Sequence, residues 1–204
     1  MRRPIAILST ALLLSGLLAG TASAGVPHEV DQSGLLPPLN PDFTYRCFAS
    51  GGGILCQGIF DPVYEDEDTG LSCDGSPILT TGSGHERLQR WHLPDGRATK
   101  TIVQLHYDET WTLASTDRTL RFQGDWNRHY DYLVPGVRAQ RVLTETGSAV
   151  KLTAPGFGLV AHDVGLLRYA PGAEGETPDE MHGPHDTWED FDTFLEQVCD
   201  ALGA

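Results

Sequence analysis

The central part of the chain, residues 84–171, is a succession of short runs in which apolar and polar side chains alternate. Val103, Leu105 and Tyr107, for example, would share one side of an extended segment, with polar residues between them. This period of two is typical of β-strands that bury one face. Turn sequences such as PDG at 94–96 separate the runs, and no stretch has helical periodicity long enough for a βαβ unit. The pattern predicts a mainly β fold, an antiparallel barrel or sandwich of about eight to nine short strands.

The last segment, TWEDFDTFLEQVCDALGA, has the period of a helix instead. Five apolar side chains form one stripe at helical spacing; they are Trp188, Phe191, Leu195, Val198 and Leu202. Thr187 is a suitable N-cap, and the acids that follow it would lie at the positive end of the helix dipole. Gly203 is a suitable end. We therefore expect one α-helix over 187–202, packed on the sheet.

The first 24 residues have the pattern of a secretion signal. Two arginines precede an apolar stretch, and small residues ending at Ala24 form a cleavage site. No later apolar run approaches the ~18 residues that a membrane-spanning helix needs. We expect a signal peptide over 1–24, a proline-rich extended arm over 25–42 and a single domain over 43–204. The protein would be secreted and extracellular, with no membrane span.

Four cysteines lie beyond the expected cleavage site, and an even number in an oxidising compartment favours two disulfides. In YRCFASGGGILCQGIF, a two-residue glycine turn places Cys47 opposite Cys56 on a non-hydrogen-bonded pair, where Cα atoms lie about 4.5 Å apart. Cys73 is then left for Cys199, and this bond would pin the last helix across the sheet. A thiolate metal site would need close pairs such as C-x-x-C, and the sequence has none.

The charge balance excludes two classes of partner. Beyond Ala24 the chain carries 12 basic and 28 acidic residues, a formal net charge of −16, against −14 for the whole chain. Nucleic-acid binding requires clustered cations, and so does binding to anionic lipid surfaces. We therefore expect neither as a partner.

One histidine cluster resembles a metal or catalytic site. The stretch EMHGPHDTWED brings His182, His185 and Asp186 close together in sequence. Pro184 disfavours helical geometry at the residue before it, so the two imidazoles cannot share a helical face as in H-E-x-x-H. Zinc also needs three or four ligands. We expect no metal and no cofactor, and keep His182, His185 and Asp186 as the less favoured alternative, a metal site.

The sequence contains no recognised catalytic set. His162 and Asp163 are adjacent on an expected strand and would point to opposite faces, which favours a structural role over a catalytic dyad. Ser83 lies in TGSGHE, which is typical of a loop and lacks the G-x-S-x-G spacing. Several aromatic residues could line a sugar or lipid cavity, although strand aromatics are more often core. These are Trp91, Tyr107, Trp111, Trp126, Tyr130 and Tyr132.

Several segments together resemble a group of small secreted actinobacterial proteins. They are the Cys-bearing hairpin, LSCDGSPILTTG, VLTETGSAVKL, APGFGLVAHDVGLLRYAPG and the final LEQVCDALG. The resemblance covers nearly the whole chain beyond the signal. It implies export, disulfides and a compact β-fold, and it supplies no catalytic residue.

Three functions remain open. The first hypothesis is a non-enzymatic secreted β-domain that binds a small molecule or a protein outside the cell, although an early G-x-W lipocalin motif is missing. The second is a small extracellular hydrolase that uses His and Asp residues, and the third is an envelope-associated structural protein. An apolar cavity would favour the first, converging His and Asp side chains the second, and a filled core the third.

Overall fold

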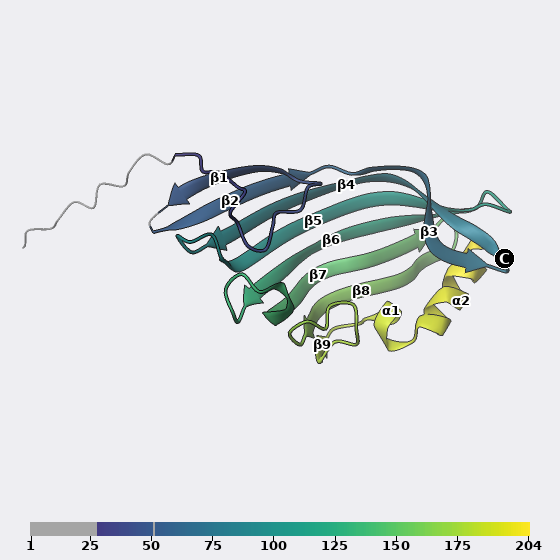
Figure 1. Cartoon of the computed structure of the whole chain (residues 1–204). Helices are drawn as coiled ribbons and strands as arrows, with labels where there is room; N and C mark the ends of the chain where they lie inside the picture. The colour runs from purple at the N-terminus through teal and green to yellow at the C-terminus, as the bar shows by residue number, and fades with distance from the viewer. Residues whose placement is uncertain (1–27, 51) are drawn as a thin grey trace, which may run out of the picture.

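The computed structural model describes residues 28–50 and 52–204. The signal peptide expected over 1–24 lies outside these residues. One antiparallel sheet of nine strands makes up most of the described chain, and two helices follow it near the C-terminus (Figure 1). The prediction of a mainly β, antiparallel fold is confirmed. The sheet does not close on itself, so it fits the sandwich-like alternative and not the barrel, with loops and helices as the second layer.

The strands lie in the order β1-β2-β4-β5-β6-β7-β8-β9, and β3 pairs with the first half of β4. Their bounds are β1 Thr44–Ser50, β2 Gly53–Phe60, β3 Val63–Cys73, β4 Ser76–His92, β5 Ala98–Leu113, β6 Thr119–Tyr132, β7 Arg141–Ala154, β8 Gly158–Tyr169 and β9 Glu180–His182. A short 3-10 helix, η1 Arg138–Gln140, precedes β7. The second half of β4 pairs with β2, so β4 joins two hairpins into one sheet.

The strands are longer than the sequence predicted. Strand β4 has 17 residues and β5 has 16, because runs expected to be separate are continuous. The segment around Ser83, expected to be a loop, is part of β4 and pairs with Val63 and Asp108. Asp108 and Glu109 continue β5 rather than interrupt it. On the inner side, Glu109 accepts hydrogen bonds from Thr80 and from the indole of Trp111.

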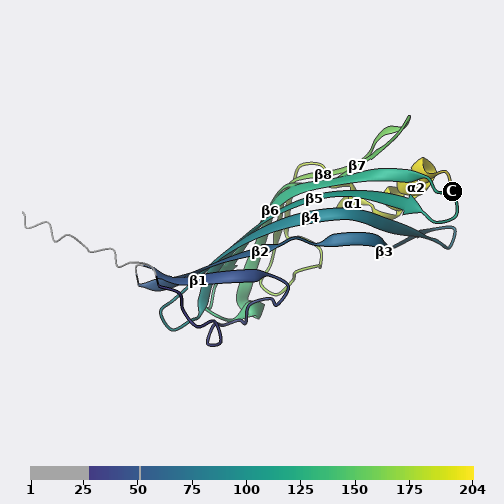
Figure 2. The same ribbon diagram turned by 90° about the horizontal axis from the view of Figure 1, so that it is seen from above.

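The sheet buries one side, which we call the inner face, and leaves the other polar. At one end of the inner face Ile78, Leu113 and Leu120 pack beneath the last helix. At the other end, residues 28–42, which we call the arm, cross the sheet. Figure 2 shows the arm and the helices at opposite ends of the sheet. The inner face is therefore covered from both ends by non-sheet segments.

The structure contains the disulfides Cys47–Cys56 and Cys73–Cys199, the two pairs expected from the sequence. The first joins opposite residues of β1 and β2, with Cα atoms 4.0 Å apart. The second joins the end of β3 to the last helix, with Cα atoms 5.5 Å apart. Residues 126 apart in sequence are thereby tied together.

The expectation of a single helix over 187–202 is wrong. The chain forms α1 Asp186–Glu189 and α2 Phe191–Leu202, and Asp190 between them is extended. Asp190 caps α2, since its carboxylate accepts from the backbone N–H and hydroxyl of Thr193. Thr187 is not a cap, because its N–H and hydroxyl donate to the buried carboxylate of Asp163 on β8.

The break also changes which side chains of the last helix are buried. Phe194, Val198 and Leu202 face the core, whereas Phe191 is 50% exposed and Trp188 is 39% exposed. The apolar stripe expected from the sequence assumed one continuous helix through Asp190. Because the helix is interrupted there, the first two residues of that stripe, Trp188 and Phe191, are exposed instead of buried. No helix in the described ranges is long and apolar enough to cross a membrane.

Candidate functional site

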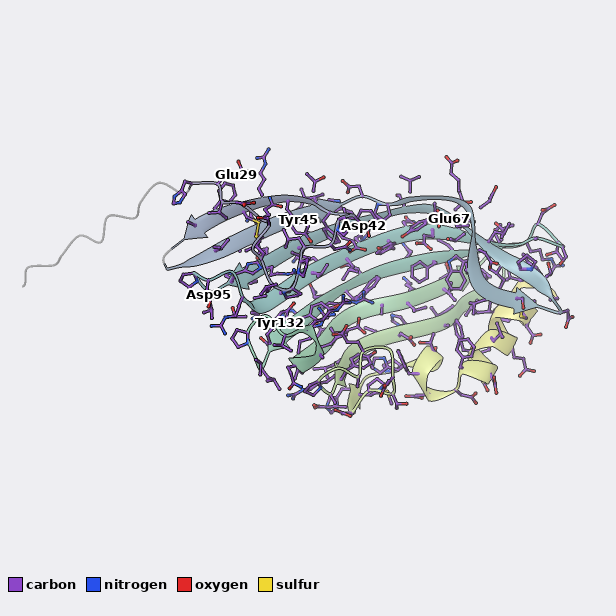
Figure 3. All side chains as sticks on the ribbon, in the orientation of Figure 1. Glu29, Asp42, Tyr45, Glu67, Asp95 and Tyr132 are labelled. Carbon is purple, nitrogen blue, oxygen red and sulfur yellow. A yellow bond between two sulfur atoms is a disulfide. The ribbon has the colours of Figure 1, made fainter. Side chains whose placement is uncertain are left out.

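A cavity of about 630 Å³ lies between the arm and the inner face, and we call it the arm cavity. Residues 37–41 and Phe43 line one side of it, and β4 and β5, together with β6, η1 and β7, supply the other. A volume of this size is within the range of small-molecule binding sites. Asp42, Tyr45 and Tyr132 lie at this end of the sheet, away from α2 (Figure 3).

The arm is held on both sides of the cavity. Val30 N–H donates to the Cys47 carbonyl of β1, and Leu36 exchanges backbone hydrogen bonds with the turn before β5 through Gly96 and Ala98. Leu35 is 3% exposed and packs on the Cys47–Cys56 disulfide. The prolines that follow cannot donate to a strand ladder. Beyond the single bridges at Glu29 and Leu36, residues 37–41 cover the sheet without strand pairing, and a space remains beneath them.

The floor of the arm cavity is apolar. Leu88 on β4 and Val103 on β5 are opposite one another, and Leu105 lies next along β5 on the same side. All three are buried. They belong to the alternating runs that the sequence showed, and alternation is the reason they share one face. The floor gives a ligand apolar surface on which to lie.

Four arginines surround this apolar floor, although the chain has only 14 basic residues against 28 acidic ones. They are Arg90 on β4, Arg128 on β6, Arg138 in η1 and Arg141 at the start of β7. A strongly acidic protein thus gathers more than a quarter of its cations around one cavity. The local field therefore depends on which of these four cations have carboxylate partners.

Two of the four arginines form ion pairs within the fold. Arg128 pairs with Glu145 on the neighbouring strand, and Arg141 pairs with Glu174. The guanidinium of Arg141 also lies 4.1 Å from the ring centroid of Tyr130, a cation–π contact. Arg128, Arg141 and Tyr130 are therefore held in place in the wall of the cavity.

Arg90 is buried without a counter-ion. It is 6% exposed, and its Nε donates to the Thr101 hydroxyl at 3.1 Å. Its Nη1 lies 3.4 Å from the carbonyl oxygens of Pro37 and Pro38 in the arm. Within residues 28–50 and 52–204 no carboxylate lies within 4.0 Å of its guanidinium. Its positive charge is thus surrounded by neutral acceptors only.

The charge of Arg90 affects its neighbours. Burial lowers the pKa of His92 to about 4, and the positive charge of Arg90 acts in the same direction. His92 is 4% exposed, and neither ring nitrogen has a hydrogen-bond partner among the described atoms. Burial raises the pKa of the Tyr45 hydroxyl, which Arg90 partly opposes. At neutral pH Arg90, which lines the cavity, is therefore positively charged, and His92, buried two residues further along β4, is a neutral imidazole.

The other end of the cavity, along β4, is acidic. Glu86 accepts a hydrogen bond from the hydroxyl of Tyr107. Burial, followed by the hydrogen bond and charge of Glu86, raises the pKa of Tyr107, so this phenol stays protonated. The ring of Tyr107 lies over Gly84, where a Cβ atom would meet it at 2.5 Å. The cavity therefore has one basic and one acidic end.

The three residues kept as candidate metal ligands, His182, His185 and Asp186, do not form a metal site. His182 Nε2 contacts Glu180 at 2.8 Å, and His185 Nε2 lies 3.2 Å from the His182 carbonyl oxygen. Asp186 accepts from the backbone N–H of His162 instead. No group of three metal-ligating side chains occurs in the part of the chain that the structure describes. The contacts of Asp186 hold α1 on the sheet.

His162 and Asp163 have separate surroundings, as the strand argument predicted. Asp163 is buried and binds Thr187, whereas His162 Nε2 lies 3.3 Å from the Ser148 hydroxyl. Along the described chain, the His162 ring has no carboxylate partner to orient it as a triad would require. Ser83 is exposed on β4.

The aromatic residues of the strands have mixed roles. Tyr132 is buried, which fits the core interpretation. Tyr130 lines the arm cavity. Trp126 and Tyr107 continue the inner face beyond it, and their ring centroids are 5.6 Å apart.

The four arginines that line the arm cavity were not predicted from the sequence. In HERLQRWHL the alternation places Arg90 on the same side as Glu86, Leu88 and His92, a mostly polar set, so the sequence carried no clear signal that Arg90 is buried.

Comparison with family models, curated proteins and solved structures found no match. The resemblance to small secreted actinobacterial proteins therefore stays a prediction.

Proposed function

We propose that this chain is a secreted, non-enzymatic protein that binds a small organic molecule in the arm cavity. The observation that carries this proposal is the cavity itself: about 630 Å³ of space with an apolar floor, formed where the arm crosses the sheet. The cavity is partly open to solvent, so a ligand can enter it, and it combines an apolar floor with a few charged groups, as small-molecule sites do.

Export is part of the proposal and has separate support. The apolar N-terminal segment has the pattern of a secretion signal, and two disulfides suit an oxidising compartment. Expression of the full chain in a secreting host should release a product that begins at Gly25. A product retained in the cytoplasm with its N-terminus intact would contradict export.

Binding is tested with the neutral apolar dye N-phenyl-1-naphthylamine, whose fluorescence rises in apolar surroundings. The wild-type chain should bind it at one site. Val103→Phe directs a larger side chain into the cavity from its floor and should weaken dye binding at least tenfold. Ile102→Phe is the matched control, because Ile102 lies next to Val103 in β5 and faces the opposite side of the sheet.

Val103→Phe must leave the fold intact for this comparison, and far-ultraviolet circular dichroism checks that. If both variants weaken dye binding equally, the cavity is not the binding site of the dye.

A further inference from the structure

The guanidinium groups of the arm cavity differ in whether the fold neutralises them. Arg128 and Arg141 have carboxylate partners. Arg138 is exposed at the rim, where water solvates its charge. Arg90 alone of the four is both buried and without a carboxylate partner in the described structure. The cavity thus has a single buried charge that remains to be balanced.

A largely buried cation with only neutral partners is unfavourable, because it has lost most of its hydration and gained no opposite charge. Thr101 and the two proline carbonyls accept from Nε and Nη1 of Arg90. The second terminal amino group, Nη2, has no hydrogen-bond acceptor within the described residues. An anionic group in the cavity would supply both the acceptor and the charge.

The remainder of the cavity restricts what this anion is attached to. Arg90, Leu88 and Glu86 are alternate residues of β4 and lie on the same side of the sheet. At ~3.3 Å per residue, the Cα atoms of Arg90 and Glu86 are about 13 Å apart. The apolar floor of Leu88, Val103 and Leu105 lies between them. The carboxylate of Glu86 would repel a second anionic group at the far end.

We propose that the ligand of the arm cavity is an amphiphilic organic anion with one anionic group, bound to Arg90, and an apolar body that lies on the floor toward Glu86. The inference rests on the proposed function, since it requires the cavity to be a binding site. The N–H donors of Nη2 are the ones left for the anion, and an oxygen of a carboxylate or a sulfonate would accept from them in a charge-assisted hydrogen bond.

Three probes with the same alkyl chain test the charge preference by titration calorimetry below their aggregation concentrations: dodecanoate, dodecanol and dodecyltrimethylammonium. Dodecanoate should bind the wild-type chain roughly 10- to 100-fold more tightly than dodecanol, as hydrogen bonds to a charged group add that much. The ammonium probe should bind most weakly, because it would place a second positive charge beside Arg90.

Two variants test the assignment to Arg90. Arg90→Met keeps much of the side-chain volume and removes the charge, so dodecanoate should lose its advantage while dodecanol stays within about threefold of wild type. Arg87→Met is the control, since Arg87 lies on the same strand, faces the other side and is exposed. If Arg90→Met does not fold, Arg90→Lys replaces it. This variant should keep the preference for dodecanoate and bind it less tightly, because a single ammonium group cannot contact Thr101, the arm carbonyls and the anion together.

The outcomes separate the two proposals. Equal binding of dodecanoate and dodecanol, or a preference for the ammonium probe, would overturn the anion while leaving the cavity as a binding site. A preference for dodecanoate that survives Arg90→Met would overturn the role of Arg90. If the neutral dye and all three probes fail to bind, the proposed function itself is wrong.

Discussion

Acid should destabilise this protein through His92, whose imidazole is buried at the end of β4, two residues from Arg90. Its side chain is 4% exposed and both ring nitrogens lack partners within the described structure. Burial and then the charge of Arg90 lower the pKa of His92 from 6.5 to about 4. The unfolded chain, with an ordinary histidine, therefore binds a proton that the folded chain rejects throughout this pH interval.

The sign and size follow from proton linkage. Stability rises with pH wherever the unfolded state binds more protons, so the contribution of His92 is fully present above pH 6.5 and is lost as the pH falls toward 4. A tenfold difference in proton affinity between the folded and unfolded chain is equivalent to about 1.4 kcal/mol. The unfolding free energy should therefore fall by about 2 kcal/mol between pH 7 and pH 5, and by about 3 kcal/mol at pH 4.

The assay is urea unfolding at several pH values for wild type and for His92→Leu, a non-titrating side chain of similar volume with no unpaired polar atoms. The variant should lose about 2 kcal/mol less than wild type between pH 7 and pH 5. His106→Gln is the control for the loss of one histidine from the exposed outer side of β5. Parallel pH profiles for wild type and His92→Leu would refute the reasoning.

Three further substitutions test the parts of the fold that support the inner face. Cys199→Ser removes the link between residues 126 apart in sequence and should lower the unfolding free energy by about 3–5 kcal/mol; an unchanged melting temperature would show that the bond does not tether α2. Asp163→Asn weakens the hydrogen bonds to Thr187 and should cost about 1–3 kcal/mol, with faster amide exchange in α1 as the measure. Gly165→Ala would place a Cβ atom 1.9 Å from the His182 carbonyl oxygen, at a positive φ of 135°. It should cost about 1–3 kcal/mol and release β9, which solvent exchange at that strand reports.

The pairing of Cys47 with Cys56 could be predicted because it depends on a short local segment. A glycine turn fixes the register of the hairpin, and the register brings the two cysteines opposite each other. Assignment of Cys73 to Cys199 followed by elimination. Neither step required knowledge of the rest of the fold.

The strand lengths and the helix break were missed for different reasons. Residues around Ser83 and Asp108 have the composition of turns, yet they pair with each other across β4 and β5. Pairing with neighbours on both sides overrides the local preference for a turn. In the last segment, Thr187 bonds to Asp163 on β8 and cannot cap, so Asp190 begins the second helix.

The sequence by itself determined the β class, the disulfide hairpin and the presence of an apolar-faced helical segment at the end, because each depends on spacing over a few residues. Only the tertiary structure decided where the arginines meet. Arg90, Arg128 and Arg141 come from three strands, and sheet register together with the crossing of the arm places them around one cavity. A periodic pattern shows which side of its own strand a residue occupies. Which residues of other strands share that side of the sheet depends on pairing between segments distant in sequence. The arm cavity, and with it the proposed function, could therefore be recognised only from the tertiary structure.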